Sequence, residues 1–261
     1  MSIRYIVCLI SLCAFVLSCK KKTEESVMPT PVPVNETKYG KAGLHLHYYV
    51  GNIELDTLSF NHPVNQADTG RKISLGYGQF YLSDFEYINN DGSVFALPNG
   101  AVLKKGSFPT YVAGNIPVGI YKGIRFKVGL KPELDTSISS PTLNDPAMLF
   151  GSKAQGHIYV NIQGKIDTTS NATGTLDKMQ PFSYKIGTSL HLTSVTNLPP
   201  TSINVMETGV EYLHIVFDLK LLFKGVQLNN PGNLSVNSLS DNNSAVAAKI
   251  AANIPNSFRF E

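Results

Sequence analysis

The fold of this chain is decided by two stretches, Gln79-Phe-Tyr-Leu-Ser-Asp-Phe-Glu-Tyr-Ile88 and Gly119-Ile-Tyr-Lys-Gly-Ile-Arg-Phe-Lys-Val-Gly-Leu130. In the second stretch, apolar side chains at Ile124, Phe126 and Val128 alternate with Arg125 and Lys127. Strict alternation is typical of a β-strand with one buried and one solvated face. The two stretches therefore predict the centre of a β-sheet.

A reversal of the chain follows the first of these strands. Asn90-Asp-Gly92 supplies residues that tolerate positive φ angles, so the sequence predicts a hairpin there. Further alternating segments predict strands over Gly43–Val50, Ile53–Phe60, Gly156–Gly164, Phe182–Ile186, Leu190–Val195 and Tyr212–Phe223. We expect an all-β fold, an antiparallel β-sandwich of the immunoglobulin-like or Greek-key type.

One helix is expected, close to the end of the chain. Ser244 can cap it, Val246 and Ile250 stack one turn apart, and Pro255 ends it, so the helix should run from Ser244 to Asn253.

The first residues have the pattern of a bacterial lipoprotein signal. Arg4 precedes a short apolar run that ends at Cys19, and a run of this length does not span a bilayer. We therefore expect a signal peptide over residues 1–18, lipidation of Cys19, a proline-rich tether over residues 19–38 and a β-sandwich domain over residues 39–261. An ordinary signal peptide with a chance cysteine is the alternative.

This pattern predicts a protein anchored to a membrane of the bacterial cell envelope, with the outer membrane as the expected location and the domain facing the periplasm or the cell surface. All three cysteines precede residue 20, so the domain has neither a disulfide nor a thiolate metal site.

Several function classes are excluded by composition and motifs. The formal net charge of +3 lies partly in the run Lys20–Lys22, and no basic patch interleaved with aromatic residues indicates nucleic-acid binding. The chain has no nucleophile elbow, zinc-protease motif or phosphate loop, so we expect no enzyme activity. Asp84 and Glu86 share a strand face and could suggest paired carboxylates for acid–base catalysis, but a charged outer face of the sheet explains them better. Asn89–Gly92 offers oxygen ligands but lacks the spacing of a calcium-binding loop.

His45 and His47 form the sharpest candidate site. Residues i and i+2 of a strand share one face and lie about 6.6 Å apart, so both imidazoles can approach one ion. Imidazole suits copper, which has the highest affinity among the divalent first-row metals. The alternative is that both histidines only cover a solvated strand face.

Other residues could complete such a site. His157, His191 and His214 also fall on polar strand faces, and any of them could contribute if its strand lies beside the first one. Met148 offers a soft thioether for reduced copper, although such a methionine also serves as core filler. His62, in a loop before a proline, is a weaker candidate.

The order of these motifs resembles the MbnP-like family of bacterial copper-binding proteins. The motifs that carry the resemblance are Gly43-Leu-His-Leu-His-Tyr-Tyr, Gln79-Phe-Tyr-Leu-Ser-Asp-Phe, Gly119-Ile-Tyr-Lys-Gly-Ile-Arg-Phe, Gly156-His-Ile-Tyr-Val-Asn, Phe182-Ser-Tyr-Lys-Ile-Gly and Ala248-Lys-Ile-Ala-Ala-Asn-Ile. The resemblance implies copper as the cofactor and a copper-handling or haem-containing protein as a partner.

The sequence departs from this family at two places. Gly151 and Lys153 stand where the family carries tryptophans, one of which can be oxidised to a kynurenine beside the copper, and Lys185 replaces a family histidine. A kynurenine ligand is therefore impossible here. These losses motivate a second hypothesis, a metal-free adhesion or ligand-binding lipoprotein on the same scaffold.

Overall fold

The computed structural model describes residues 36–55, 64–65, 71–135, 140–169 and 175–261. The signal segment, Cys19, His62 and most of the tether lie outside these residues, so those predictions stay predictions. In the described part of the chain, no helix is both long and apolar enough to cross a membrane.

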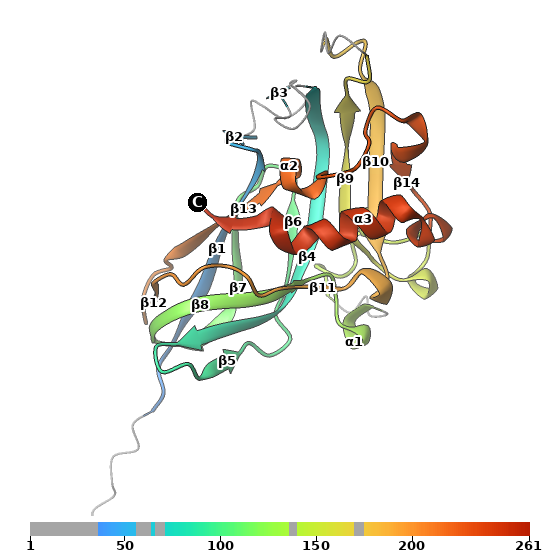
Figure 1. The fold of residues 1–261 in the computed structure, drawn as a ribbon. Coiled ribbons are helices and arrows are strands. Elements are labelled where there is room, and N and C mark those ends of the chain that lie inside the picture. Colours follow the sequence, from blue (N-terminus) through green and yellow to red (C-terminus); the bar gives the residue numbers. More distant parts are fainter. Residues whose placement is uncertain (1–35, 56–63, 66–70, 136–139, 170–174) are drawn as a thin grey trace, which may run out of the picture. The chain divides into compact units, whose positions relative to one another are not determined.

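Two sheets make up the domain (Figure 1). The strands of the first sheet are β1 (Tyr39–Val50), β2 (Ile53–Glu54), β7 (Thr110–Pro117), β13 (Tyr212–Asp218) and β15 (Phe258–Phe260). The strands of the second are β3 (Val64–Asn65), β4 (Lys72–Asn89), β5 (Val94–Ala96), β6 (Ala101–Lys105), β8 (Gly119–Val128), β9 (Ile158–Ile166), β10 (Gln180–Gly187), β11 (Thr193–Val195), β12 (Ile203–Val205) and β14 (Ser235–Val236).

Three α-helices accompany the sheets in the described residues: α1 (Pro132–Asp135), α2 (Leu219–Leu222) and α3 (Ala245–Asn253). The 3₁₀ turns are Pro146–Met148, Lys153–Gln155, Ser189–His191, Pro231–Asn233, Ser240–Asn243 and Ile254–Ser257. The predicted late helix is confirmed as α3, and the Ser244 side chain accepts a hydrogen bond from the backbone N–H of Ala247.

The long strand β4 is the centre of the second sheet, as the sequence predicts. It pairs antiparallel with β5, β6, β8 and β9. The predicted hairpin is confirmed, because the backbone N–H of Asn89 donates to the carbonyl of Ser93 and Gly92 adopts a φ of 90°. A β-bulge interrupts β4 between Ser83 and Glu86, where Asp84 has a φ of 49°.

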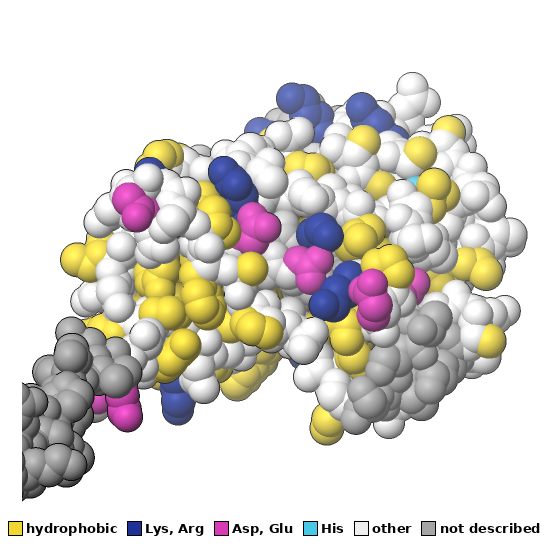
Figure 2. Space-filling model, turned by 90° about the horizontal axis from the view of Figure 1, so that it is seen from below, with side chains coloured by type: hydrophobic (Ala, Val, Ile, Leu, Met, Phe, Trp, Pro, Cys, Tyr) yellow, Lys and Arg dark blue, Asp and Glu magenta, His cyan; other side chains and the backbone are white. Residues whose placement is uncertain are grey.

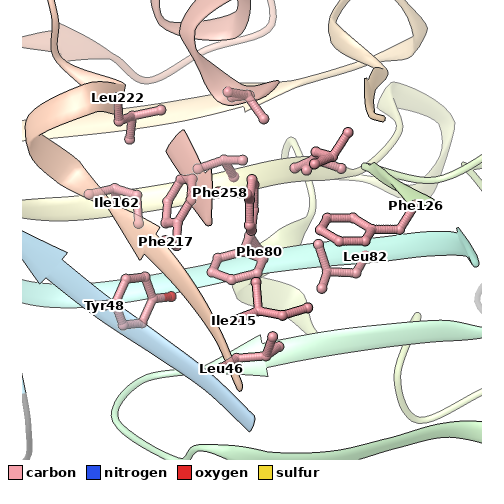
Figure 3. Packing of buried hydrophobic residues seen from close by; sticks show 14 of the residues in the cluster. Leu46, Tyr48, Phe80, Leu82, Phe126, Ile162, Ile215, Phe217, Leu222 and Phe258 are labelled. Carbon is pink, nitrogen blue, oxygen red and sulfur yellow. The ribbon is translucent and has the colours of Figure 1, made fainter. Parts of the chain in front are cut away.

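The main hydrophobic core fills the space between the sheets (Figure 3). The Phe217 ring from β13 lies 4.9 Å from the Phe80 ring of β4 and 4.8 Å from the Phe258 ring of β15, measured between ring centroids. Tyr48 from β1 meets Phe80 edge-on at 5.7 Å. Aromatic packing between strands of both sheets fixes the face that β1 turns inward.

The prediction of an all-β sandwich is confirmed, with three details that alternation could not show. β1 and β13 pair in parallel, as do β10 and β14, whereas the other strand pairs are antiparallel. The strand predicted over Tyr212–Phe223 ends at Asp218, because the Asp218 carboxylate caps α2 by accepting from the N–H of Lys220. The strand predicted over Leu190–Val195 begins at Thr193, after a 3₁₀ turn.

A second, smaller cluster covers part of the outer face of the second sheet. Residues 140–155 fold back on it, burying Leu143, Met148 and Phe150 against Tyr81 and Tyr159. The prediction that His157 lies on a polar strand face is therefore wrong, since His157 and its neighbours on that face, Tyr159 and Asn161, are at most 1% exposed.

Candidate metal centre

Three histidines meet on the outer face of the first sheet. Leu44, Leu46 and Tyr48 point into the core, so the intervening His45 and His47 point away from it, as the alternation predicts. β13 lies beside β1 in a register that places His214 directly opposite His45. The structure thus selects His214 among the candidates that the sequence left open.

The three imidazoles are close enough to share an ion. Their ring centroids are separated by 4.3 Å for His45 and His47, 4.4 Å for His45 and His214, and 5.7 Å for His47 and His214. One ligand nitrogen from each ring lies within 4.8 Å of the others. Metal–nitrogen bonds of about 2.0 Å require nitrogens roughly 3.3 Å apart in a tetrahedral site. Small side-chain rotations would achieve this closure, so the donor set fits a metal that prefers nitrogen ligands.

Glu54 fixes the tautomer of His47. The Nδ1 atom of His47 lies 2.6 Å from Oε1 of Glu54, and it must donate a proton because a carboxylate only accepts. In the neutral ring, the lone pair of His47 is therefore on Nε2. Nε2 is buried without a hydrogen-bond partner among the described residues, and Oε2 of Glu261 stays 3.6 Å away. An orphaned, buried imidazole nitrogen held by a carboxylate behind it is the arrangement found in metal-binding histidines.

Glu261 orients the third histidine. Its Oε2 atom accepts from Nδ1 of His214 at 2.9 Å, while Oε1 accepts from the Tyr49 hydroxyl at 2.6 Å. The Tyr49 hydrogen bond lowers the pKa of Glu261 in spite of partial burial, and the nearby histidines lower it further. Burial and the Glu261 carboxylate together raise the pKa of Tyr49 to about 12. His214, like His47, thus directs Nε2 away from its carboxylate.

His45 is kept neutral by its surroundings. Burial lowers the pKa of His45, and the adjacent His47 and His214 lower it further because a positive charge on one ring disfavours a second. A metal ligand must be unprotonated, so this environment favours the form that binds.

His157 is arranged for a structural role. Its Nδ1 faces the backbone carbonyl of Asp135, and its Nε2 lies 3.0 Å from the carbonyl of Leu143. Two carbonyl acceptors require a proton on both nitrogens, which leaves no lone pair for a metal. Burial alone would lower the pKa of His157, but these hydrogen bonds and the Asp135 carboxylate, 3.5 Å from Nδ1, raise it overall.

The structure does not bring Met148 or His191, two further candidates among the described residues, to the three histidines. Met148 is fully buried in the smaller cluster, among Leu143, Tyr81 and Tyr159. His191 is 5% exposed and lies 2.8 Å from the carbonyl of Asn242 through Nε2, so its predicted position on a polar face is wrong. In the parts of the chain that the structure describes, His45, His47 and His214 form the group that could hold a metal.

A cavity of about 220 Å³ adjoins the site, with His45, His47, Glu54 and Lys104 in its wall. Lys104 is 1% exposed, and burial lowers its pKa to about 7. Its ammonium donates to the carbonyl of Phe108 and lies 5.0 Å from the centre of the Tyr48 ring. A metal bound by the histidines would therefore lie beside this small cavity, whose wall includes the weakly charged amine of Lys104.

Sequence reasoning missed the two carboxylates. Glu54 lies beside His47 because the short β2 pairs antiparallel with the end of β1, and Glu261 lies beside His214 because it follows β15, which pairs with β13. Alternation on Tyr212–Asp218 does place His214 on the outer face. However, the adjacency of β13 to β1 depends on a parallel pairing between segments far apart in sequence.

A β-sandwich with three histidines on an outer strand face defines this as a candidate metal-binding domain. The model of the MbnP family matches residues 39–238, and the chain belongs to this family. It is also similar to the solved structure of MbnP from Methylosinus trichosporium, with a TM-score of 0.54 and 15% sequence identity over 82% of this chain and 87% of that one. At this identity the likeness concerns the fold. A comparison with curated proteins found no match.

Proposed function

We propose that the protein binds copper at His45, His47 and His214 and serves in copper trafficking or storage, without enzyme activity. The observation that carries the proposal is the convergence of three imidazoles, of which His47 offers an orphaned Nε2 and His214 is oriented by a carboxylate. Membership of the MbnP family supports copper as the metal. The proposal does not need a kynurenine, which this chain cannot form.

The chain's own residues perform three tasks in this function. The parallel pairing of β1 with β13 fixes the spacing of the histidines, Glu54 and Glu261 orient two of the rings, and the surroundings of His45 keep it unprotonated. Bound copper would supply the ion that is stored or transferred. The His214 side chain is 48% exposed, so the site opens to solvent and a partner protein can reach it.

We further propose that Cys19 carries a lipid that anchors the protein to a membrane of the bacterial envelope, with the domain at the periplasmic or outer surface. The motif at the start of the sequence supports this placement, and a copper-handling or haem-containing protein of the envelope is the partner that fits it. Metabolic labelling with a fatty acid, compared between the natural chain and Cys19→Ala, tests the anchor. Equal labelling of both chains would disprove it.

A copper titration tests the binding site. The domain from Lys38 to Glu261 is titrated with reduced and with oxidised copper against a chelator of known affinity. We expect one ion per chain, and loss of that ion in the double variant His45→Ala, His47→Ala with an unchanged circular dichroism spectrum. Unchanged stoichiometry in a folded double variant would contradict the assignment.

The second candidate function is a metal-free adhesion or ligand-binding protein. The replacement of the family's metal-associated positions by Gly151 and Lys185 favours it. If the natural chain binds neither reduced nor oxidised copper, this second function is favoured over copper binding.

A further inference from the structure

A trough crosses the second sheet where the β-bulge in β4 lies. Its volume is about 470 Å³, within the range of small-molecule sites. Residues of β4, β5, β8 and β11 line it, together with the segments that follow β5, β8 and β11. It shares no lining residue with the cavity beside the histidines. Figure 2 looks onto the side of the molecule that carries β5 and β8, and acidic and basic side chains interleave across the middle of this face.

Opposite charges are paired side by side in the trough. Nζ of Lys127 donates to Oδ2 of Asp84 at 2.8 Å. Beside them, the Arg125 guanidinium lies 3.9 Å from a carboxylate oxygen of Glu86, which is too far for a hydrogen bond. Both side chains of this second pair are more than 40% exposed. Arg125 and Glu86 therefore keep hydrogen-bonding capacity for a ligand.

Lys131 adds a further cation at one end. Its Nζ donates to the amide oxygen of Asn99 at 3.2 Å, a neutral partner that leaves the lysine charge in place. The lining thus combines three cations with two carboxylates. Ser194, Thr196 and Asn99 add groups that can hydrogen-bond to backbone amides.

The backbone around the trough is unusual. Among the described residues other than glycine, three have a positive φ, and two of these, Asp84 at 49° and Asn99 at 53°, line the trough. Left-handed residues and bulges gather at binding and active sites, where they aim particular side chains. Here the bulge places Asp84 against Lys127, and the turn places Asn99 against Lys131.

We propose that this trough binds a short peptide with free ends. Arg125 and Lys131 would hold the terminal carboxylate, Glu86 would hold the terminal ammonium, and the polar wall would hydrogen-bond to the peptide amides. A zwitterion matches a lining with both signs of charge, which would repel neither end. Arg125 suits this task because its planar guanidinium can bind a carboxylate through two parallel hydrogen bonds.

The test uses the full chain in detergent micelles and four forms of trialanine: unblocked, N-acetylated, C-amidated and blocked at both ends. Binding is followed by amide chemical shifts. We expect the unblocked peptide to bind best and each block to weaken binding roughly 3- to 5-fold, the upper part of the range for exposed ion pairs. The shifts should centre on residues of β4 and β8.

Two variants locate the ends of the peptide. Arg125→Gln should weaken binding of the unblocked peptide about as much as amidation does, by roughly 3- to 5-fold. It should leave the affinity for the C-amidated peptide unchanged. Glu86→Gln should behave in the same way toward the N-acetylated peptide. Lys122→Gln is the matched control, since Lys122 is a lysine of β8 outside the trough lining whose ammonium donates to the carbonyl of Asn90.

Three results would overturn the proposal. The four peptides could bind equally, the chemical shift changes could lie away from the trough, or no peptide could bind at concentrations up to about 10 mM, which is the weakest dissociation constant expected of such a site. Because copper is left out of every sample, the result does not depend on the metal site.

Discussion

Two groups of histidines in this domain have opposite arrangements. On the outer face of the first sheet, His47 and His214 each give one nitrogen to a carboxylate and keep the other nitrogen available. On the second sheet, His157 gives both nitrogens to backbone carbonyls and is fully buried. Hydrogen bonding, rather than residue type or strand position, therefore separates a candidate ligand from a structural histidine.

The difference also reverses the expected protonation state. His45 is surrounded by other imidazoles, and burial together with those neighbours lowers its pKa. His157 is surrounded by acceptors, which raise its pKa against the effect of burial. The first environment suits a metal cation, and the second favours the protonated form of the histidine itself.

The largest effect on stability is expected from His157→Leu. This change removes the buried imidazole that donates to the carbonyl groups of Asp135 and Leu143. Breaking one side of such a buried group costs about 3 kcal/mol. Urea denaturation at pH 6.5 measures the loss, and copper affinity should stay at the natural value. Loss of copper binding in a folded His157→Leu chain would contradict the assignment of a purely structural role to His157.

The sequence predicted the two groups only in part. Alternation placed His45, His47 and His214 outward correctly, because the apolar residues between them fill a core that any sandwich must have. The same reasoning failed for His157, because residues 140–155 cover a face that the strand alone leaves open. The identity of the third histidine and both carboxylates depend on strand neighbours, which periodicity does not encode.

The next effect is expected on copper affinity in His214→Ala. Removing one of three ligands should weaken binding about 100-fold, or roughly 2.7 kcal/mol. The free energy of unfolding without metal should change by less than about 0.5 kcal/mol, since the side chain is largely exposed. Competition with a chelator and urea denaturation of the same sample check both values. Equal affinity of the variant and the natural chain would reduce the site to His45 and His47.

A smaller effect should follow from Glu54→Gln. The amide can still approach Nδ1 of His47, but it no longer compels that nitrogen to carry the proton. Loss of an orienting carboxylate behind a metal-binding histidine costs about 10-fold in affinity, or roughly 1.4 kcal/mol. Glu207→Gln is the control, because Glu207 pairs with Lys38 instead of a histidine. The same small change in both variants would remove Glu54 from the site.

The smallest effect is expected in the pH dependence of stability without metal. The pKa of His157 is raised above 6.5 in the folded chain, so its stabilisation is complete below pH 6.5 and declines as the pH rises through the folded pKa. The pKa of His45 is lowered below 6.5, so His45 destabilises the folded chain in acid, and this cost disappears as the pH approaches 6.5. In urea denaturation from pH 5 to pH 9, the stability difference between the natural chain and His157→Leu should therefore shrink with rising pH. His45→Gln should instead be more stable than the natural chain only at the acid end. Parallel curves for both variants would show that the two environments do not differ in protonation, and the contrast would then rest on geometry alone.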